Sequence, residues 1–206
     1  MENKRFIIGL GGPTGGGKTA AGKILEKHGF LEIDTDAVSH RILDEKKNLI
    51  LAEFSCEAGE KGLPLLDEQG NLLRKNLGKL LFSDSSLLKR HESIIYPELK
   101  KIIEGKILEN RNRNIVVNGA VLYKIPEILS LCTFVLYIYS PFFTRLVRLI
   151  KRDKIPFPQL IERMKAQKNL FAKYSEQYAD IVKVKNRGTL ENLEKNLLTV
   201  LARYGL

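Results

Sequence analysis

The chain has 206 residues, 44% of them hydrophobic and 28% charged, a composition ordinary for a globular domain with a sizeable core. The 34 Lys and Arg against 24 Asp and Glu give a net charge of +10, which suits an anionic partner, a polyphosphate or a nucleic acid, without choosing between them. No apolar run approaches the roughly 18 residues of a membrane helix, and no signal peptide is expected. Cys56 and Cys132 lack metal-ligand spacing, so we expect reduced cysteines in a cytoplasmic protein.

The first predicted strand, residues 5–10, runs into a glycine-rich segment, Gly12-Pro-Thr-Gly-Gly-Gly-Lys18-Thr19. This segment fits G-x-x-x-x-G-K-[ST], and a helix-compatible run over residues 19–27 follows it, as the phosphate-binding P-loop requires. An ordinary glycine-rich turn would not need both flanking elements. The predicted nucleoside triphosphate site uses Pro13, Thr14, Gly15, Gly16, Gly17, Lys18 and Thr19.

Each residue type of this segment has a physical task. Gly15, Gly16 and Gly17 can take positive φ angles, which lets backbone N–H groups close around phosphate oxygens. The helix N-terminus adds a partial positive charge at the same point. Lys18 can reach the outer phosphates, and the Thr19 hydroxyl can hold Mg²⁺.

The remaining chain alternates predicted strands with predicted helices. Further strands are expected over residues 30–34, 114–118, 132–139 and 181–184. Helices are expected over residues 37–45, 71–82, 85–109, 141–153, 158–178 and 189–204. Residues 46–70 predict loops around a short helical piece, and Pro97 should break or kink the helix that contains it.

This alternation predicts an α/β fold in which a parallel sheet is covered on both faces. Ligands of such sheets bind beyond the carboxyl ends of the strands. The candidate segments at strand ends are therefore the P-loop, residues 34–36 and residues 118–124.

Asp34-Thr35-Asp36 follows the second strand and would face a triphosphate across the cleft. Transfer of a phosphoryl group to a hydroxyl needs a group that orients the hydroxyl and accepts its proton, and Asp36 can do this. An N-cap of the next helix is an equally good interpretation of Asp36 from spacing alone.

Four cations, Arg145, Arg148, Lys151 and Arg152, lie close to one face of the helix at 141–153. They predict either a mobile lid that brings an arginine to a transferred phosphate or a solvated basic face, and from the charges alone we favour the solvated face. Taken singly, Arg74, Gln167 and Asn186 indicate nothing beyond surface positions.

Together the elements resemble the dephospho-CoA kinase family, over residues 9 to about 193. The matching segments are Gly9-Leu-Gly-Gly-Pro-Thr-Gly-Gly-Gly-Lys18-Thr19, Ile33-Asp34-Thr35-Asp36, Gly70-Asn-Leu-Leu-Arg74 with Leu77-Gly78 and Phe82-Ser-Asp84, Glu92-Ser-Ile-Ile-Tyr96-Pro97, Arg148 with Arg152-Asp153 and Gln167, Ala179-Asp180-Ile-Val, and Asn186-Arg-Gly-Thr189. The P-loop is shared by many kinases, whereas this ordered set is much more specific.

The resemblance implies a single P-loop kinase domain over residues 1–206: a three-layer fold with a five-stranded parallel sheet, a helical substrate-binding region at about 60–112 and a lid at about 142–165. It implies transfer of the ATP γ-phosphate to the 3′-hydroxyl of dephospho-CoA, with Mg²⁺ and without a nucleic-acid or membrane partner. Asp36 matches the family's proposed catalytic aspartate and Arg148 its lid arginine, while Lys18 serves the donor. Asp34, Arg74 and Lys124 fall on the acceptor side.

The sequence departs from the family on that acceptor side. After the third strand the family has Asp-x-Pro-Leu-Leu-Phe-Glu, where this chain has Asn118-Gly-Ala-Val-Leu-Tyr-Lys124, so Ala120 replaces proline and Lys124 reverses a charge. Tyr96 replaces a histidine, and Arg145 stands where the family usually has glutamine. Lys124 can contact an acceptor phosphate or pair with a local carboxylate. A kinase of another small hydroxyl acceptor, such as a nucleoside or nucleotide, and an inactive nucleotide-binding or nucleic-acid-binding relative stay open.

Overall fold

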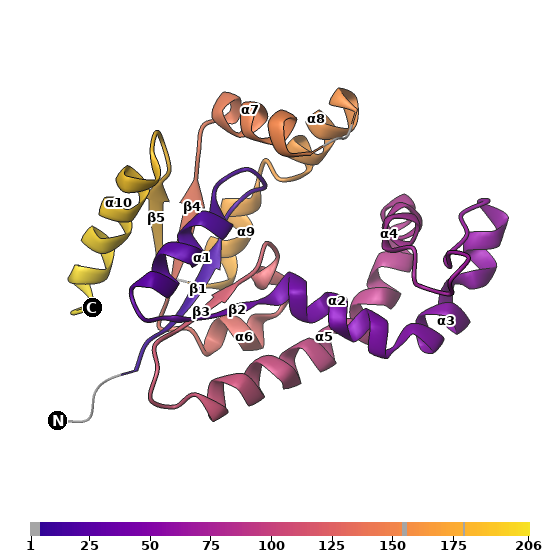
Figure 1. Cartoon of the computed structure of the whole chain (residues 1–206), viewed down its shortest axis with the longest axis horizontal. Helices are drawn as coiled ribbons and strands as arrows, with labels where there is room; N and C mark the ends of the chain where they lie inside the picture. Colours follow the sequence, from indigo (N-terminus) through magenta and orange to yellow (C-terminus); the bar gives the residue numbers. More distant parts are fainter. Residues whose placement is uncertain (1–4, 154–155, 179) are drawn as a thin grey trace. The chain divides into compact units, whose positions relative to one another are not determined.

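Five strands form one parallel sheet in a computed structural model that describes residues 5–153, 156–178 and 180–206. The strands are β1 (Ile7–Gly11), β2 (Leu31–Asp34), β3 (Ile115–Asn118), β4 (Phe134–Tyr139) and β5 (Ile181–Lys185), in the spatial order β2-β3-β1-β4-β5 (Figure 1). This confirms the predicted α/β fold with a five-stranded parallel sheet. The sheet belongs to a compact unit of residues 1–34 and 104–206, here the sheet unit, while residues 35–103 form a second compact unit, the helical unit.

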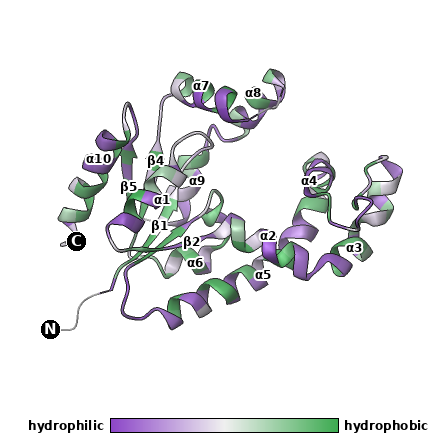
Figure 2. Cartoon of the chain, viewed as in Figure 1, coloured by the Kyte–Doolittle hydropathy of each residue, from purple (hydrophilic) through white to green (hydrophobic). Residues whose placement is uncertain are grey.

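Both faces of the sheet carry helices, because its strands are apolar on both sides. Alternate residues of β1, Ile8 and Leu10, pack with α1 (Lys18–Lys27) and α10 (Leu190–Arg203) in one large apolar cluster. On the opposite face Tyr137 of β4 meets α9 (Leu170–Gln177) edge-on through Tyr174. Figure 2 shows the strands in the hydrophobic colour and the helices with mixed faces.

The register of the sheet brings three strand ends level with one another. Asn118 at the end of β3 lies opposite Leu10 of β1 on one side and opposite Asp34 of β2 on the other. The glycine-rich segment, residues 34–36 and residues 118–124 therefore leave the sheet at one edge, as the parallel-sheet rule predicts.

Two helices that follow β4, α7 (Phe142–Arg152) and α8 (Phe157–Ala166), lie side by side (Figure 1). They share a small apolar cluster of Leu149, Leu160 and Met164. Arg163 of α8 also pairs with Asp153 at the end of α7, at 3.4 Å. Residues 154 and 155 of the expected lid, and Ala179 of the closing motif, lie outside the described residues.

The prediction of a single helix over residues 158–178 is wrong, because the chain forms α8 and α9 there with a break between them. Gln167 ends α8, and the backbone N–H of Leu170 turns back onto the Gln167 carbonyl. At this break the side chain of Gln167 accepts a hydrogen bond from the Thr14 N–H of the glycine-rich segment.

The helical unit contains α2 (Thr35–Glu45), α3 (Lys47–Glu60), α4 (Arg74–Ser83) and most of α5 (Ser85–Glu109). The prediction for residues 46–70 is wrong over α3, whose Ile50, Phe54 and Ala58 recur at helical spacing and are buried. Of the break or kink predicted at Pro97, the break is wrong, since α5 continues through this residue, with buried Ile95 and Leu99 on either side, while the kink stays a prediction.

Within the ranges that the structure describes, the search for a helix long and apolar enough to span a membrane finds no candidate.

Candidate active site

The segment between β1 and α1 folds into a tight loop that ends at the helix N-terminus. The Gly16 N–H donates to the Pro13 carbonyl at 2.9 Å, and Gly17, with φ +108°, is the N-cap of α1. Gly16 does not take the positive φ that the sequence analysis allowed it. Glycine is needed at this position for steric reasons instead, because a Cβ would lie 2.8 Å from the Pro13 carbonyl oxygen and 2.9 Å from the Ile138 carbonyl oxygen.

Side chains hold the carbonyl groups of the loop, the glycine-rich segment 12–17. Lys18 Nζ donates to Gly12 O at 2.7 Å, Arg145 Nε to Thr14 O at 2.8 Å, and Asn186 Nδ2 to Gly16 O at 2.8 Å. In a trans peptide the N–H of the next residue points opposite to the carbonyl, so the N–H groups of Gly15 and Gly17 point away from these side chains. With the α1 N-terminus they form an anion cradle.

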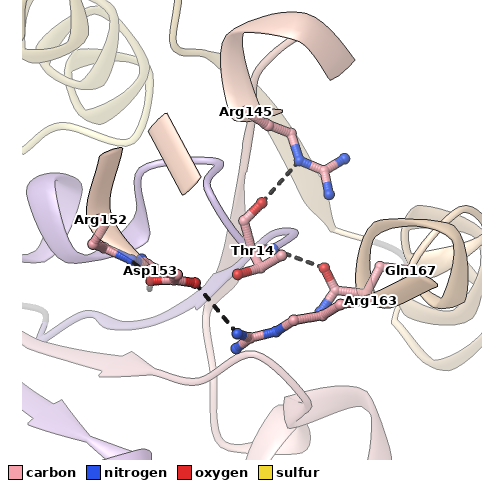
Figure 3. A network of polar contacts seen from close by, with 6 residues as sticks. All are labelled: Thr14, Arg145, Arg152, Asp153, Arg163 and Gln167. Carbon is pink, nitrogen blue, oxygen red and sulfur yellow. Dashed lines mark hydrogen bonds and ion pairs between the residues drawn. The ribbon is translucent and has the colours of Figure 1, made fainter. Parts of the chain in front are cut away.

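Two of the predicted nucleotide-binding residues, Pro13 and Thr14, have no free backbone N–H to offer a phosphate. Pro13 has no backbone N–H, and the N–H of Thr14 donates to Gln167 Oε1 at 2.8 Å. Figure 3 shows Arg145 and Gln167 reaching different backbone atoms of Thr14 from two helices. The loop is thus tied to both α7 and the break after α8.

The expected lid arginine, Arg148, contacts the loop directly. Its Nη1 lies 3.4 Å from Gly15 O and 3.0 Å from Ser140 Oγ, and its Nη2 lies 3.3 Å from Asn186 Oδ1. Ser140 and Asn186 are buried, and the Ser140 hydroxyl donates to the Asn186 carbonyl at 2.6 Å. This network holds a guanidinium beside the anion cradle.

A solvated basic face on α7 is therefore wrong for two of its four cations. Arg145 and Arg148 turn to the loop, whereas Arg152 is exposed and pairs with Asp153 at 2.6 Å. That pair, with Arg163, holds the pKa of Asp153 below its ordinary value. Charge spacing alone does not distinguish Arg145 and Arg148 from Lys151 and Arg152, since the contacts depend on where α7 lies after the end of β4.

Sequence reasoning missed Ser140, which connects Arg148 to Asn186. Ser140 is the first residue after β4, so the strand-end rule that selected residues 34–36 and 118–124 would also select it. Asn186, the first residue after β5, follows the same rule but entered the analysis only through the family resemblance.

On the side where the acceptor is expected, Asn118 and Glu32 form a polar pair between neighbouring strands. Asn118 Nδ2 donates to Glu32 Oε1 at 2.7 Å. Burial raises the pKa of Glu32, and the hydrogen bond from Asn118 partly offsets this rise. Asp34 follows on β2, level with Asn118, and Lys124 ends the short 3₁₀ turn η1 (Leu122–Lys124).

The altered segment after β3 is anchored by α9. The hydroxyl of Tyr174 donates to Gly119 O at 3.1 Å and lies 3.3 Å from Ala120 O. Tyr123 packs edge-on against the same ring, at a centroid distance of 5.4 Å. A buried tyrosine thus supports the backbone where Ala120 replaces the family's proline.

Two predicted site residues belong to the helical unit, which is described by itself. Asp36 lies inside the first turn of α2, which begins at Thr35, so it does not stand before the helix as an N-cap would. Arg74 begins α4 and pairs with Asp44 at 2.5 Å. The roles of Asp36 and Arg74 toward a nucleotide or an acceptor stay predictions.

Comparison with known proteins identifies the chain's relatives. The family model described as dephospho-CoA kinase matches residues 6–192. Dephospho-CoA kinases of Treponema denticola and Treponema pallidum are 37% and 34% identical, over 97% of this chain and 91% and 96% of theirs. The crystal structure of TT1252 from Thermus thermophilus has the same fold, with a TM-score of 0.79, 24% identity and 98% of both chains covered.

Proposed function

Since the chain belongs to the dephospho-CoA kinase family, we propose that its loop, Arg148 and Asp36 together transfer the γ-phosphate of ATP to the 3′-hydroxyl of dephospho-CoA. The products are coenzyme A and ADP. The observation that carries the proposal is the loop itself, whose carbonyls are held by side chains and whose N–H groups and helix end form the anion cradle.

The donor side uses residues of the sheet unit. The backbone of Gly15 to Thr19 binds the phosphates of ATP, and Lys18 moves from the Gly12 carbonyl to the outer phosphates when the nucleotide binds. Arg148 already contacts the Gly15 carbonyl and carries the charge that the transferred phosphoryl group needs. Pro13 and Thr14 shape the loop.

On the acceptor side, the oxygen of the 3′-hydroxyl attacks the γ-phosphorus and the bond to the bridging oxygen of ADP breaks. We assign the acceptance of the hydroxyl proton to Asp36 because it follows the end of β2 by two residues and matches the family's proposed catalytic aspartate. Asp34, Arg74 and Lys124 bind dephospho-CoA, and Lys124 supplies a cation where the family has a glutamate.

Mg²⁺ fits this site through the nucleotide. Thr19 lies in the first turn of α1 and is exposed, so its hydroxyl can offer one oxygen ligand to an ion whose other ligands are phosphates and water. When bound, Mg²⁺ neutralises charge on the phosphates. We also propose a cytoplasmic location, which the free cysteines Cys56 and Cys132 support.

The test is ADP release in the presence of ATP, Mg²⁺ and dephospho-CoA. Asp36→Asn should lower kcat by about 100-fold or more, because a positioned base contributes about this much, while ATP affinity changes less than about threefold. Glu45→Gln removes an exposed carboxylate from the other end of α2 and should leave kcat within about twofold.

Two results would contradict the proposal. Wild-type protein that releases no ADP above the ATP-only blank would reject dephospho-CoA as acceptor, and turnover on a panel of nucleosides would then support another acceptor. An unchanged kcat in Asp36→Asn would reject only the assignment of Asp36 as the base and would leave the proposed reaction standing.

A further inference from the structure

Helix α7 presents two arginines to the loop, and they differ in how their donors are used. Both terminal nitrogens of Arg148 have partners in Gly15, Ser140 and Asn186. Within the described ranges, Arg145 donates only its Nε–H, to Thr14 O at 2.8 Å, and its Nη2 is buried without a hydrogen-bond partner. The guanidinium of Arg145 therefore has a hydrogen-bond donor that the described residues do not use.

Leaving this donor unpaired is unfavourable. Burial lowers the pKa of Arg145, but an arginine still keeps its charge. Among the residues that the structure describes, no carboxylate pairs with Arg145. Buried charges are normally paired and hydrogen-bonded. Binding of an anion would therefore supply the acceptor that the Nη2 donor of Arg145 lacks.

Arg145 is one of the residues that line a pocket of about 430 Å³. Its lining includes three cations, Arg145, Lys165 and Lys168, and no carboxylate. Tyr137, Tyr139 and Ser140 also line the pocket, and Pro13 of the loop forms part of its wall. The lining thus carries net positive charge beside the apolar side chains of Phe142 and Met164, and its cations favour an anionic phosphoryl group over a neutral ligand.

We propose that Arg145 is a phosphate-binding residue of this pocket, and that its Nη2 holds an anionic phosphoryl oxygen of a bound substrate. The inference rests on the proposed function, which supplies two such groups, the terminal phosphate of ATP and the diphosphate of dephospho-CoA. Arg145 stands where the family usually has glutamine, so this chain adds a charge and a donor at the loop. The Nε–H bond to Thr14 holds the guanidinium in place for this contact.

The test uses inorganic tripolyphosphate as a probe of phosphate binding by the full chain, measured by calorimetry. Arg145→Gln should weaken binding about 10- to 100-fold, the range expected for loss of one charged hydrogen bond. Arg145→Lys restores the charge and should recover most of the affinity. Lys151→Gln makes the same charge change on an exposed position of α7 outside the pocket and should stay within about twofold.

The same variants identify the phosphate. A loss by Arg145→Gln that affects ATP but not ADP assigns Nη2 to the terminal phosphate, whereas a raised KM for dephospho-CoA with unchanged ATP affinity assigns it to the acceptor diphosphate. Folded Arg145→Gln that binds the probe and both substrates like wild type overturns the proposal, and so does an equal loss in Arg145→Lys. The probe does not depend on turnover, so an inactive wild type would reject the function without deciding this inference.

Discussion

Gly17 joins the loop to α1 at a point where a side chain has no room. Its φ of +108° lies in the left-handed region, and a Cβ there would approach Asn186 Nδ2 to 2.0 Å. Asn186 cannot easily yield, because it is buried and donates to Gly16 O. The Nδ2 atom of Asn186 that leaves no room for a side chain at Gly17 is also the atom that donates to the Gly16 carbonyl.

Gly17→Ala should therefore cost more than the strain of a positive φ. Gly29→Ala is the matched control, since Gly29 has φ +88° and no atom within 4 Å of the added methyl. We expect about 1–2 kcal/mol of lost unfolding free energy for Gly29→Ala and a larger loss for Gly17→Ala, which should also weaken ATP binding at least about tenfold. Denaturant unfolding and ATP titration measure both, and equal losses with unchanged ATP affinity would refute the packing argument.

The residues of the loop were predictable because the P-loop pattern is local. Gly12 to Thr19 contain the whole turn, so spacing alone indicates the cradle. The hydrogen bonds of Arg145, Ser140 and Gln167 were not predictable in this way, because each joins residues brought together by the sheet.

Among the elements, α7 and α8 form a small structure of their own. Leu149 is fully buried beside Leu160 and Met164, and its Cγ would lie 3.1 Å from a Cβ at Gly15. The packing of α8 therefore supports the helix that carries Arg145 and Arg148. So small an apolar cluster gives these helices less local stability than the sheet core has.

Leu160→Ala should loosen this pair of helices. We expect faster hydrogen exchange in α8 and a several-fold lower kcat/KM for ATP, with a smaller loss of global unfolding free energy than the 2–5 kcal/mol usual for a core leucine. Leu193→Ala, on α10 in the apolar cluster that contains Ile8 and Leu10, should show that full loss with nearly unchanged kcat at low temperature. The reverse pattern would show that the helix pair does not unfold separately.

Two of the errors at the element scale have physical causes that the structure shows. Glycines and a proline between residues 59 and 70 dominated the prediction for 46–70, although Ile50, Phe54 and Ala58 already have helical spacing. The break between α8 and α9 has no glycine or proline to signal it, and the hydrogen bond between Gln167 and Thr14 that forms there joins residues far apart in the sequence.

At the scale of the whole molecule, parallel pairing joins residues that are far apart in sequence. Asn118 and Glu32, separated by 86 positions, share a hydrogen bond across β3 and β2. The parallel sheet was predictable from the alternation of strands and helices, whereas this pair was not, since it needs the register that sets Asp34 opposite Asn118. Its partly buried carboxylate makes the stability of the sheet depend on pH.

The sign of that dependence follows from the pKa of Glu32. Burial raises this pKa above its ordinary value of 4.5, so the folded chain holds the proton more tightly than the unfolded chain. Stability is then greatest below pH 4.5 for this group, and it falls as pH rises through the folded pKa. Glu32→Gln removes the group and should flatten the pH profile in this window.

Asn118→Asp, which restores the family's residue, should steepen the same profile. It replaces the donor 2.7 Å from Glu32 Oε1 with a second carboxylate, which raises the pKa of Glu32 further by like-charge repulsion. We expect a loss of about 1–2 kcal/mol at neutral pH that recovers as pH falls, measured by denaturant unfolding across pH. Adding Glu32→Gln to Asn118→Asp should restore neutral-pH stability, because an amide can then donate to the new carboxylate. A loss that persists in the double variant would mean that Asn118 stabilises the sheet without Glu32.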